Sequence, residues 1–147
     1  MNIDIAIGKS RNATAWRNKQ MSWRELVDRC RRTHWTHDSY AEFLSSPKAR
    51  QDEIKDVGAF VGGYLVNGSR QINSVMHRQV ITLDADFASV DLWENFTTLF
   101  SLQSFMYSTH KHCPEKPRLR IVILADRPMA PDEYEPVCRR ITGLLGI

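Results

Sequence analysis

Two aspartates, Asp84 and Asp86, stand one residue apart at the end of an apolar run that begins at Val80. Because side chains alternate along a β-strand, both carboxylates are expected on one face, with Cα atoms roughly 7 Å apart. Paired acids repel one another unless a cation lies between them. Hard ions take oxygen ligands, usually one or two carboxylates together with substrate phosphates. The spacing therefore predicts a candidate site for a hard divalent ion such as Mg²⁺ at this strand end, suited to phosphoryl transfer.

A second polar group lies where one predicted strand ends and the next begins: Ser108, His110, Lys111, Arg118 and Arg120. Ser108 and His110 are two residues apart, as are Arg118 and Arg120, so each pair is expected on one face of its strand. Hydroxyl, imidazole, ammonium and guanidinium groups can together donate to the several anionic oxygens of a triphosphate. We expect both pairs to converge on the surface that carries Asp84 and to bind nucleotide phosphates there.

The elements that must position these groups follow from hydrophobic period and capping signals. The N-terminal part is predicted to hold a strand over 2–7, helices over 22–32, 38–45 and from 46 onward, and a glycine-rich β-like stretch over 57–66 followed by the hairpin signal Asn67-Gly68. From residue 79 the predicted order is strand 80–84, helix 91–102 with Leu92, Phe96, Leu99 and Phe100 inward, strands 104–109 and 119–124, and helix 132–145.

This order predicts an α+β fold in which an N-terminal α/β segment (1–78) precedes an RNA-recognition-like, that is ferredoxin-like, half (79–147). The length of 147 residues suits one domain. The predicted sheet needs one more strand, so we expect a fragment truncated before its last strand. Three dispersed cysteines, no signal peptide and no run of about 20 apolar residues predict a cytoplasmic protein without membrane contact.

The net charge of +3 is unevenly distributed along the chain. Residues 9–32 carry eight Lys or Arg against two acids, and residues 107–120 carry four against one. Basic patches of this kind suit a polyanion, either nucleic acid or triphosphate. A solvated basic face explains the first patch equally well, whereas the second adjoins the candidate site.

Taken together, these motifs resemble the archaeo-eukaryotic primase superfamily, whose members carry Asp-hydrophobic-Asp on one strand and Ser-x-His on a later one. Asp84-Ala85-Asp86 and Ser108-Thr109-His110 match these motifs, 24 residues apart with a predicted helix between them. Stretches 54–63, 81–86 and 117–122 look like primase-polymerase domains of phages and mobile elements, of the kind fused to virulence-associated-E or superfamily 3 helicases. The likeness covers roughly residues 50–147.

The resemblance implies the N-terminal part of a nucleotidyltransferase, a DNA primase or primase-polymerase that replicates a phage or mobile element. Its implied partners are a single-stranded DNA template, NTP or dNTP, and a helicase domain or partner. Asp84 and Asp86 would bind Mg²⁺ or Mn²⁺, Ser108 and His110 would contact the incoming phosphates, and His110 would be catalytic with the aspartates. The family has a third acid, for which Asp126 is the one substitute within this chain. Without it, a fragment is expected to bind metal and nucleotide weakly and to catalyse poorly or not at all.

Two functions of other classes remain open. A non-enzymatic nucleic-acid-binding domain would stack bases on the aromatic residues of the sheet, Tyr64, Phe105 and Tyr107. A metal-dependent nuclease would use Asp84 and Asp86, with His110 as general base or as acid for the leaving group.

A zinc module is a further alternative. Two compact sets of nitrogen and sulfur ligands exist: His110, His112 and Cys113, and Cys30, His34 and His37. Their spacings differ from those of common zinc modules, which favours a buried cysteine and exposed histidines instead.

Overall fold

The computed structural model describes the backbone of all 147 residues and every side chain except that of residue 72. The elements in chain order are β1 (Asn2–Gly8), β2 (Trp16–Ser22), α1 (Trp23–Arg31), α2 (Tyr40–Ser45), α3 (Lys48–Ile54), β3 (Ala59–Val61), β4 (Gly63–Leu65), η1 (Val66–Gly68), η2 (Ile72–Ser74), β5 (Val75–Ala85), α4 (Leu92–Leu99), β6 (Ser104–Ser108), β7 (Leu119–Met129) and α5 (Pro131–Leu145). The η elements are 3₁₀ turns.

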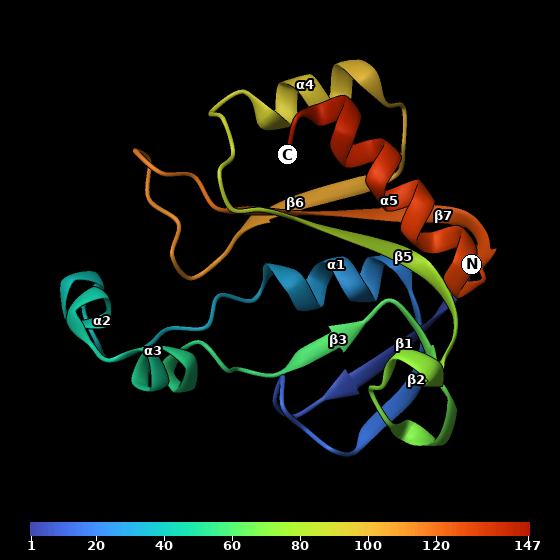
Figure 1. The fold of residues 1–147 in the computed structure, drawn as a ribbon, viewed down its shortest axis with the longest axis horizontal. Helices are drawn as coiled ribbons and strands as arrows, with labels where there is room; N and C mark the ends of the chain where they lie inside the picture. Colours follow the sequence, from blue (N-terminus) through green and yellow to red (C-terminus); the bar gives the residue numbers. More distant parts are fainter.

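The strands form two antiparallel sheets, which confirms the predicted α+β class. The smaller sheet has the order β2-β1-β3 and the larger one β4-β5-β7-β6. Helices α4 and α5 cover one face of the larger sheet, and α1 lies between its other face and the smaller sheet (Figure 1). Because β4 and the start of β5 belong to the larger sheet, that sheet extends across the predicted boundary at residue 78.

The two long central strands, β5 and β7, are buried on both faces for much of their length. Ile81 of β5 and Ile121 of β7 point into the core formed with α4 and α5. Their neighbours Val80 and Val122 point the other way and pack with Leu26 of α1 and with β1. This alternation fixes which side chains can meet at the end of the sheet, because residues two apart share a face.

Local signals predicted most elements, with three corrections. Strand β2 was not predicted because five of its seven side chains are polar; it forms by pairing with β1 along its whole length. Asn67 and Gly68 have the positive φ angles of 57° and 58° that the hairpin signal favours, but β4 and β5 are joined through both 3₁₀ turns rather than a two-residue turn. Leu99, predicted to face inward, is 55% exposed.

Among the described residues, no helix combines the length and the apolar composition that crossing a membrane requires.

Candidate functional site

The register of the larger sheet places three functional side chains in one row. Asp84 of β5 pairs with Arg120 of β7, which pairs in turn with Tyr107 of β6. Side chains directly opposite one another on neighbouring strands share a face of the sheet. The row therefore lies on the face turned toward α1, at the end of β5 where the buried part of that face gives way to solvent.

Each aspartate is held by an arginine at or just before the start of β7. Arg120 binds Asp84 in a bidentate pair, with Nε 2.5 Å from Oδ1 and Nη2 3.1 Å from Oδ2. Its remaining Nη1 donates to the hydroxyl of Tyr107 over 3.2 Å. Arg118 donates from Nη1 to Oδ1 of Asp86 over 2.9 Å. Arg120 therefore lies beside Asp84, and Arg118 lies beside Asp86.

The carboxylates of the site are more exposed to solvent than the guanidinium of Arg120. The side chains of Asp84 and Asp86 are 57% and 62% exposed, so both carboxylates stay accessible to a ligand. The guanidinium of Arg120 is more enclosed. Burial alone would lower the pKa of Arg120, but the carboxylate of Asp84 and the hydroxyl of Tyr107 outweigh it and hold the pKa above its ordinary value. Arg120 therefore stays positively charged at any working pH.

The donor set at this strand end fits a hard cation only in part. Among the described residues, no group of three or more His, Cys, Asp or Glu side chains is placed to hold a metal ion. Asp126 cannot supply a third carboxylate, because it lies six residues beyond Arg120 on β7, roughly 20 Å along the strand. Two carboxylates do suit Mg²⁺ when substrate phosphates complete its coordination. The residues therefore fit a metal that arrives with a phosphate ligand.

Ser108 lies on the wrong face for the predicted role. It pairs with Leu119, which packs against the core under α4 and α5. The side chain of Ser108 is therefore directed away from the face of Asp84, and the predicted convergence of Ser108 on that aspartate is wrong. Tyr107, one residue earlier, occupies the position on the site's face; it was predicted only as a base-stacking residue of the nucleic-acid-binding alternative.

His110 and Lys111 lie in the β6–β7 connection, because β6 ends at Ser108. Thr109 N donates to the carbonyl of Arg118 over 2.9 Å, so this connection begins directly beside Arg118. The His110 ring packs edge-on against Phe43 of α2, with ring centroids 4.4 Å apart. Partial burial, reinforced by Lys55, lowers the pKa of His110, so its imidazole is neutral at pH 7. At the left of Figure 1, α2 and this connection lie at the end of the sheet where β5 ends.

A family model described as the VapE N-terminal domain matches residues 1–147. The chain belongs to this family. The match confirms the resemblance to the virulence-associated-E group. It also extends that resemblance over the N-terminal third of the chain, where the sequence analysis found no family motif. No curated protein and no solved structure gives a match.

Neither candidate zinc set of this VapE N-terminal domain is assembled. Cys30 packs beside the core under α1, whereas His34 is exposed beyond the end of that helix. In the second set, Nδ1 of His112 accepts a hydrogen bond from the backbone N–H of Arg118 over 3.2 Å. These histidines and cysteines therefore have structural or solvated positions.

An exposed aromatic residue adjoins the carboxylates and was missed in the sequence. Phe87, directly after Asp86, is 94% exposed. The Cζ atom of Arg118 lies 5.8 Å from the centre of its ring. An aromatic face beside guanidinium groups suits the stacking of a nucleobase whose phosphates those groups bind. The sequence did contain a signal for this side chain, because Phe87 is a large apolar residue directly after the polar end of the predicted strand.

Proposed function

We propose that this domain carries a nucleotidyl-transfer site of the primase type at the ends of β5 and β7. Asp84 and Asp86 would hold Mg²⁺ or Mn²⁺, and Arg118 and Arg120 would bind the triphosphate of an NTP or dNTP. The observation that supports this assignment is the pair of neighbouring Asp–Arg contacts on one accessible strand end.

When a metal–nucleotide binds, each carboxylate and each guanidinium of the site can change its partner and still be paired with an opposite charge. Without a ligand, each guanidinium neutralises one carboxylate. A metal–triphosphate brings a cation for the carboxylates and anionic oxygens for the guanidiniums. Exposed ion pairs are worth only about 0–1 kcal/mol, so breaking the single Arg118–Asp86 hydrogen bond opposes this exchange weakly. The bidentate pair between Asp84 and the more enclosed Arg120 opposes it more strongly. The exchange requires metal and nucleotide together, which favours binding of the complex over binding of either alone.

Each residue then has a distinct role. The planar forks of Arg118 and Arg120 orient the phosphates, and the neutral ring of His110 with the ammonium of Lys111 adds donors from the β6–β7 connection. Phe87 would support the base. A bound Mg²⁺ would supply Lewis-acid stabilisation of charge on the transferred phosphoryl group. The likeness to primase-polymerase domains, together with the family match, supports single-stranded DNA as template and a helicase domain or partner acting with it.

One incubation separates this function from its alternatives. The protein is mixed with single-stranded DNA, Mn²⁺ or Mg²⁺ and labelled NTPs or dNTPs, and the products are resolved by length. New labelled oligomers are the expected result, in low yield because the described residues place no third carboxylate beside Asp84 and Asp86. Shortened DNA in the absence of nucleotides would identify a nuclease, and bound but unaltered DNA would identify a binding module.

Replacing Arg120 is expected to affect nucleotide binding and metal binding differently. Arg120→Gln is expected to weaken binding of the metal–nucleotide by roughly 10- to 100-fold, because charge-assisted hydrogen bonds are worth about 1.5–3 kcal/mol. Binding of Mn²⁺ alone should be unchanged or tighter, because Asp84 loses its competing partner. Calorimetry with nucleotide and paramagnetic resonance of Mn²⁺ measure the two affinities.

Arg24→Gln is the matched control, because it removes the same charge from a side chain that is 91% exposed on α1. It should leave both affinities unchanged. Parental nucleotide binding by Arg120→Gln would reduce the Asp–Arg contacts to ordinary surface ion pairs and remove the triphosphate assignment.

A further inference from the structure

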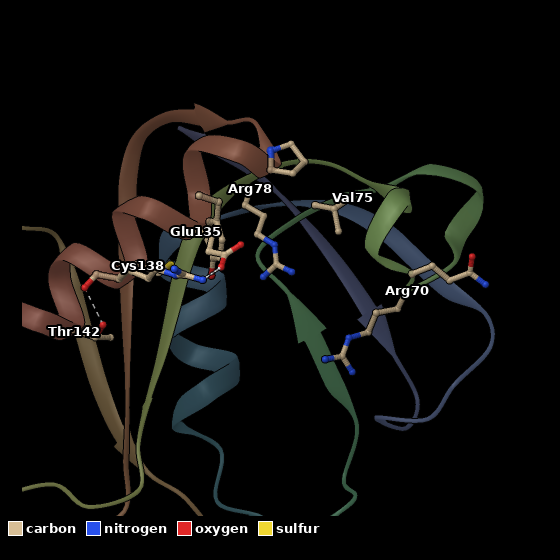
Figure 2. A pocket seen from close by; sticks show the side chains of 10 residues that line it. Arg70, Val75, Arg78, Glu135, Cys138 and Thr142 are labelled. Atoms are coloured by element: carbon tan, nitrogen blue, oxygen red, sulfur yellow. Dashed lines mark hydrogen bonds and ion pairs between the residues drawn. The ribbon is translucent and has the colours of Figure 1, made fainter.

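A groove of about 720 Å³ opens at the other end of β5. Figure 2 shows Arg78 in its middle, with Glu135, Cys138 and Thr142 of α5 on one side and Arg70 and Val75 on the other. Arg78 precedes Asp84 by six residues on β5, which separates the two sites by roughly 20 Å. The groove is therefore distinct from the carboxylate site.

Arg78 is held in the groove by an aromatic ring and not by an acid. Its Cζ atom lies 4.5 Å from the centre of the Tyr134 ring. None of the ion pairs in the described part of the chain includes Arg78, although its side chain is half-buried. Stacking occupies the face of a guanidinium and leaves its N–H donors, which lie in the plane, directed outward. Arg78 is thus oriented but lacks an anionic partner.

Arg70 lies on the opposite wall, with an exposed side chain that also contacts an aromatic ring. Its Cζ atom lies 5.4 Å from the centre of the Trp16 ring, and Nη1 donates to the carbonyl of Arg11 over 3.2 Å. Arg70 likewise takes part in none of the ion pairs found among the described residues. A guanidinium has five N–H donors, so most of those of Arg70 remain available.

The lining of the groove carries excess positive charge. Three arginines and one glutamate line it, and the glutamate, Glu135, is already paired with Arg139 one turn further along α5. Two positive charges therefore remain, those of Arg70 and Arg78. Val75 and Tyr134 supply apolar surface beside them. The ligand that matches this lining has an anionic group for the guanidiniums and a less polar body for the wall.

We propose that this groove binds the phosphodiester backbone of a single-stranded nucleic acid through Arg70 and Arg78. A phosphate accepts bidentate hydrogen bonds from each guanidinium fork, and the sugar or base beside it can lie against Val75 and Tyr134. The volume exceeds that of one phosphate group and admits part of a nucleotide unit. The proposal does not depend on nucleotidyl transfer at Asp84, and it predicts binding even where no synthesis occurs.

The test measures anisotropy of a short labelled oligothymidylate over a series of salt concentrations. The Arg70→Gln, Arg78→Gln double variant is expected to bind at least roughly 10-fold more weakly, because two phosphate contacts are lost. The slope of log affinity against log salt should fall by about 1.4, since each contact to a single strand contributes about 0.7. Arg24→Gln, with the same loss of charge per residue, should bind as the parent does. Equal weakening by Arg24→Gln would show diffuse charge attraction and overturn the groove assignment.

A further experiment distinguishes an oligonucleotide site from a site for free phosphate compounds. Thymidine monophosphate and inorganic phosphate are each titrated alone against the parent and the double variant. If the double variant loses binding of these small ligands but binds the oligonucleotide as the parent does, the groove is a free-nucleotide site and the proposal is contradicted. Oligonucleotide binding is measured without metal ion or nucleotide, so failure of the carboxylate site is distinguished from failure of the groove. Arg78→Lys keeps the charge but loses the planar fork, and its expected several-fold loss tests the groove if the double variant does not fold.

Discussion

Replacing Asp84 by asparagine is expected to lower nucleotide incorporation by roughly 1,000-fold or more. The amide conserves the shape of the side chain but removes the negative charge that would hold the metal. Metal ions supply several kcal/mol of charge stabilisation to phosphoryl transfer, and each 1.36 kcal/mol corresponds to a factor of ten in rate. Initial rates of labelled nucleotide incorporation measure the loss. Because the carboxylate is more than half exposed, the thermal melting curve should stay close to that of the parent.

Asp126→Asn is the matched control for this variant. It removes the same charge from an exposed aspartate at the far end of β7, outside the site. It should incorporate nucleotides at the parental rate, which also tests the conclusion that Asp126 is no metal ligand. Parental synthesis by Asp84→Asn would refute the carboxylate site, whatever the control does.

The face on which each side chain of a strand lies was predictable, whereas the register between neighbouring strands was not. Alternation within a strand is a local property, so Asp84 and Arg120 could each be placed on the face opposite to that of their apolar neighbours, such as Leu83 and Ile121. Whether Ser108 or Tyr107 joins Arg120 depends on the register between β6 and β7. A shift of one residue moves every side chain of a strand to the other face. Since the connection between these strands is long, its sequence does not specify the register.

The same division between local and tertiary information explains the fold. Helix α1 was predicted because Ser22 and Glu25 form a capping box, and each partner lies within one turn of the other. Strand β2 was missed because its stabilising contacts are tertiary: it pairs with β1, and Trp16 packs with Val61 and Leu65. The groove also escaped prediction, since Arg78 approaches α5 only through the packing of β5 against that helix, and Arg70 reaches the groove from the β4–β5 connection.

A pair of glycine substitutions is expected to change stability in opposite directions. Gly63→Ala should lower the free energy of unfolding by about 3 kcal/mol, because overpacking against rigid neighbours is strongly destabilising. A Cβ at Gly63 would lie 2.0 Å from the carbonyl oxygen of His77 and 2.9 Å from the Cα of Arg78. Both atoms belong to the backbone of β5, so no side-chain rotation relieves the clash. Chemical denaturation followed by circular dichroism measures the change.

Gly143→Ala is the control, with the same added methyl group in a different environment. Gly143 lies within α5, and a Cβ there would meet nothing within 4 Å. Alanine in a helix interior is favoured over glycine by about 0.5–1 kcal/mol, so this variant should be more stable than the parent. Because Gly63 pairs with Arg78, the destabilised variant should also bind oligonucleotide less tightly at temperatures where it remains folded. A Gly63→Ala protein as stable as Gly143→Ala would mean that β4 does not approach β5 this closely, and the position of Arg78 in the groove would lose its support.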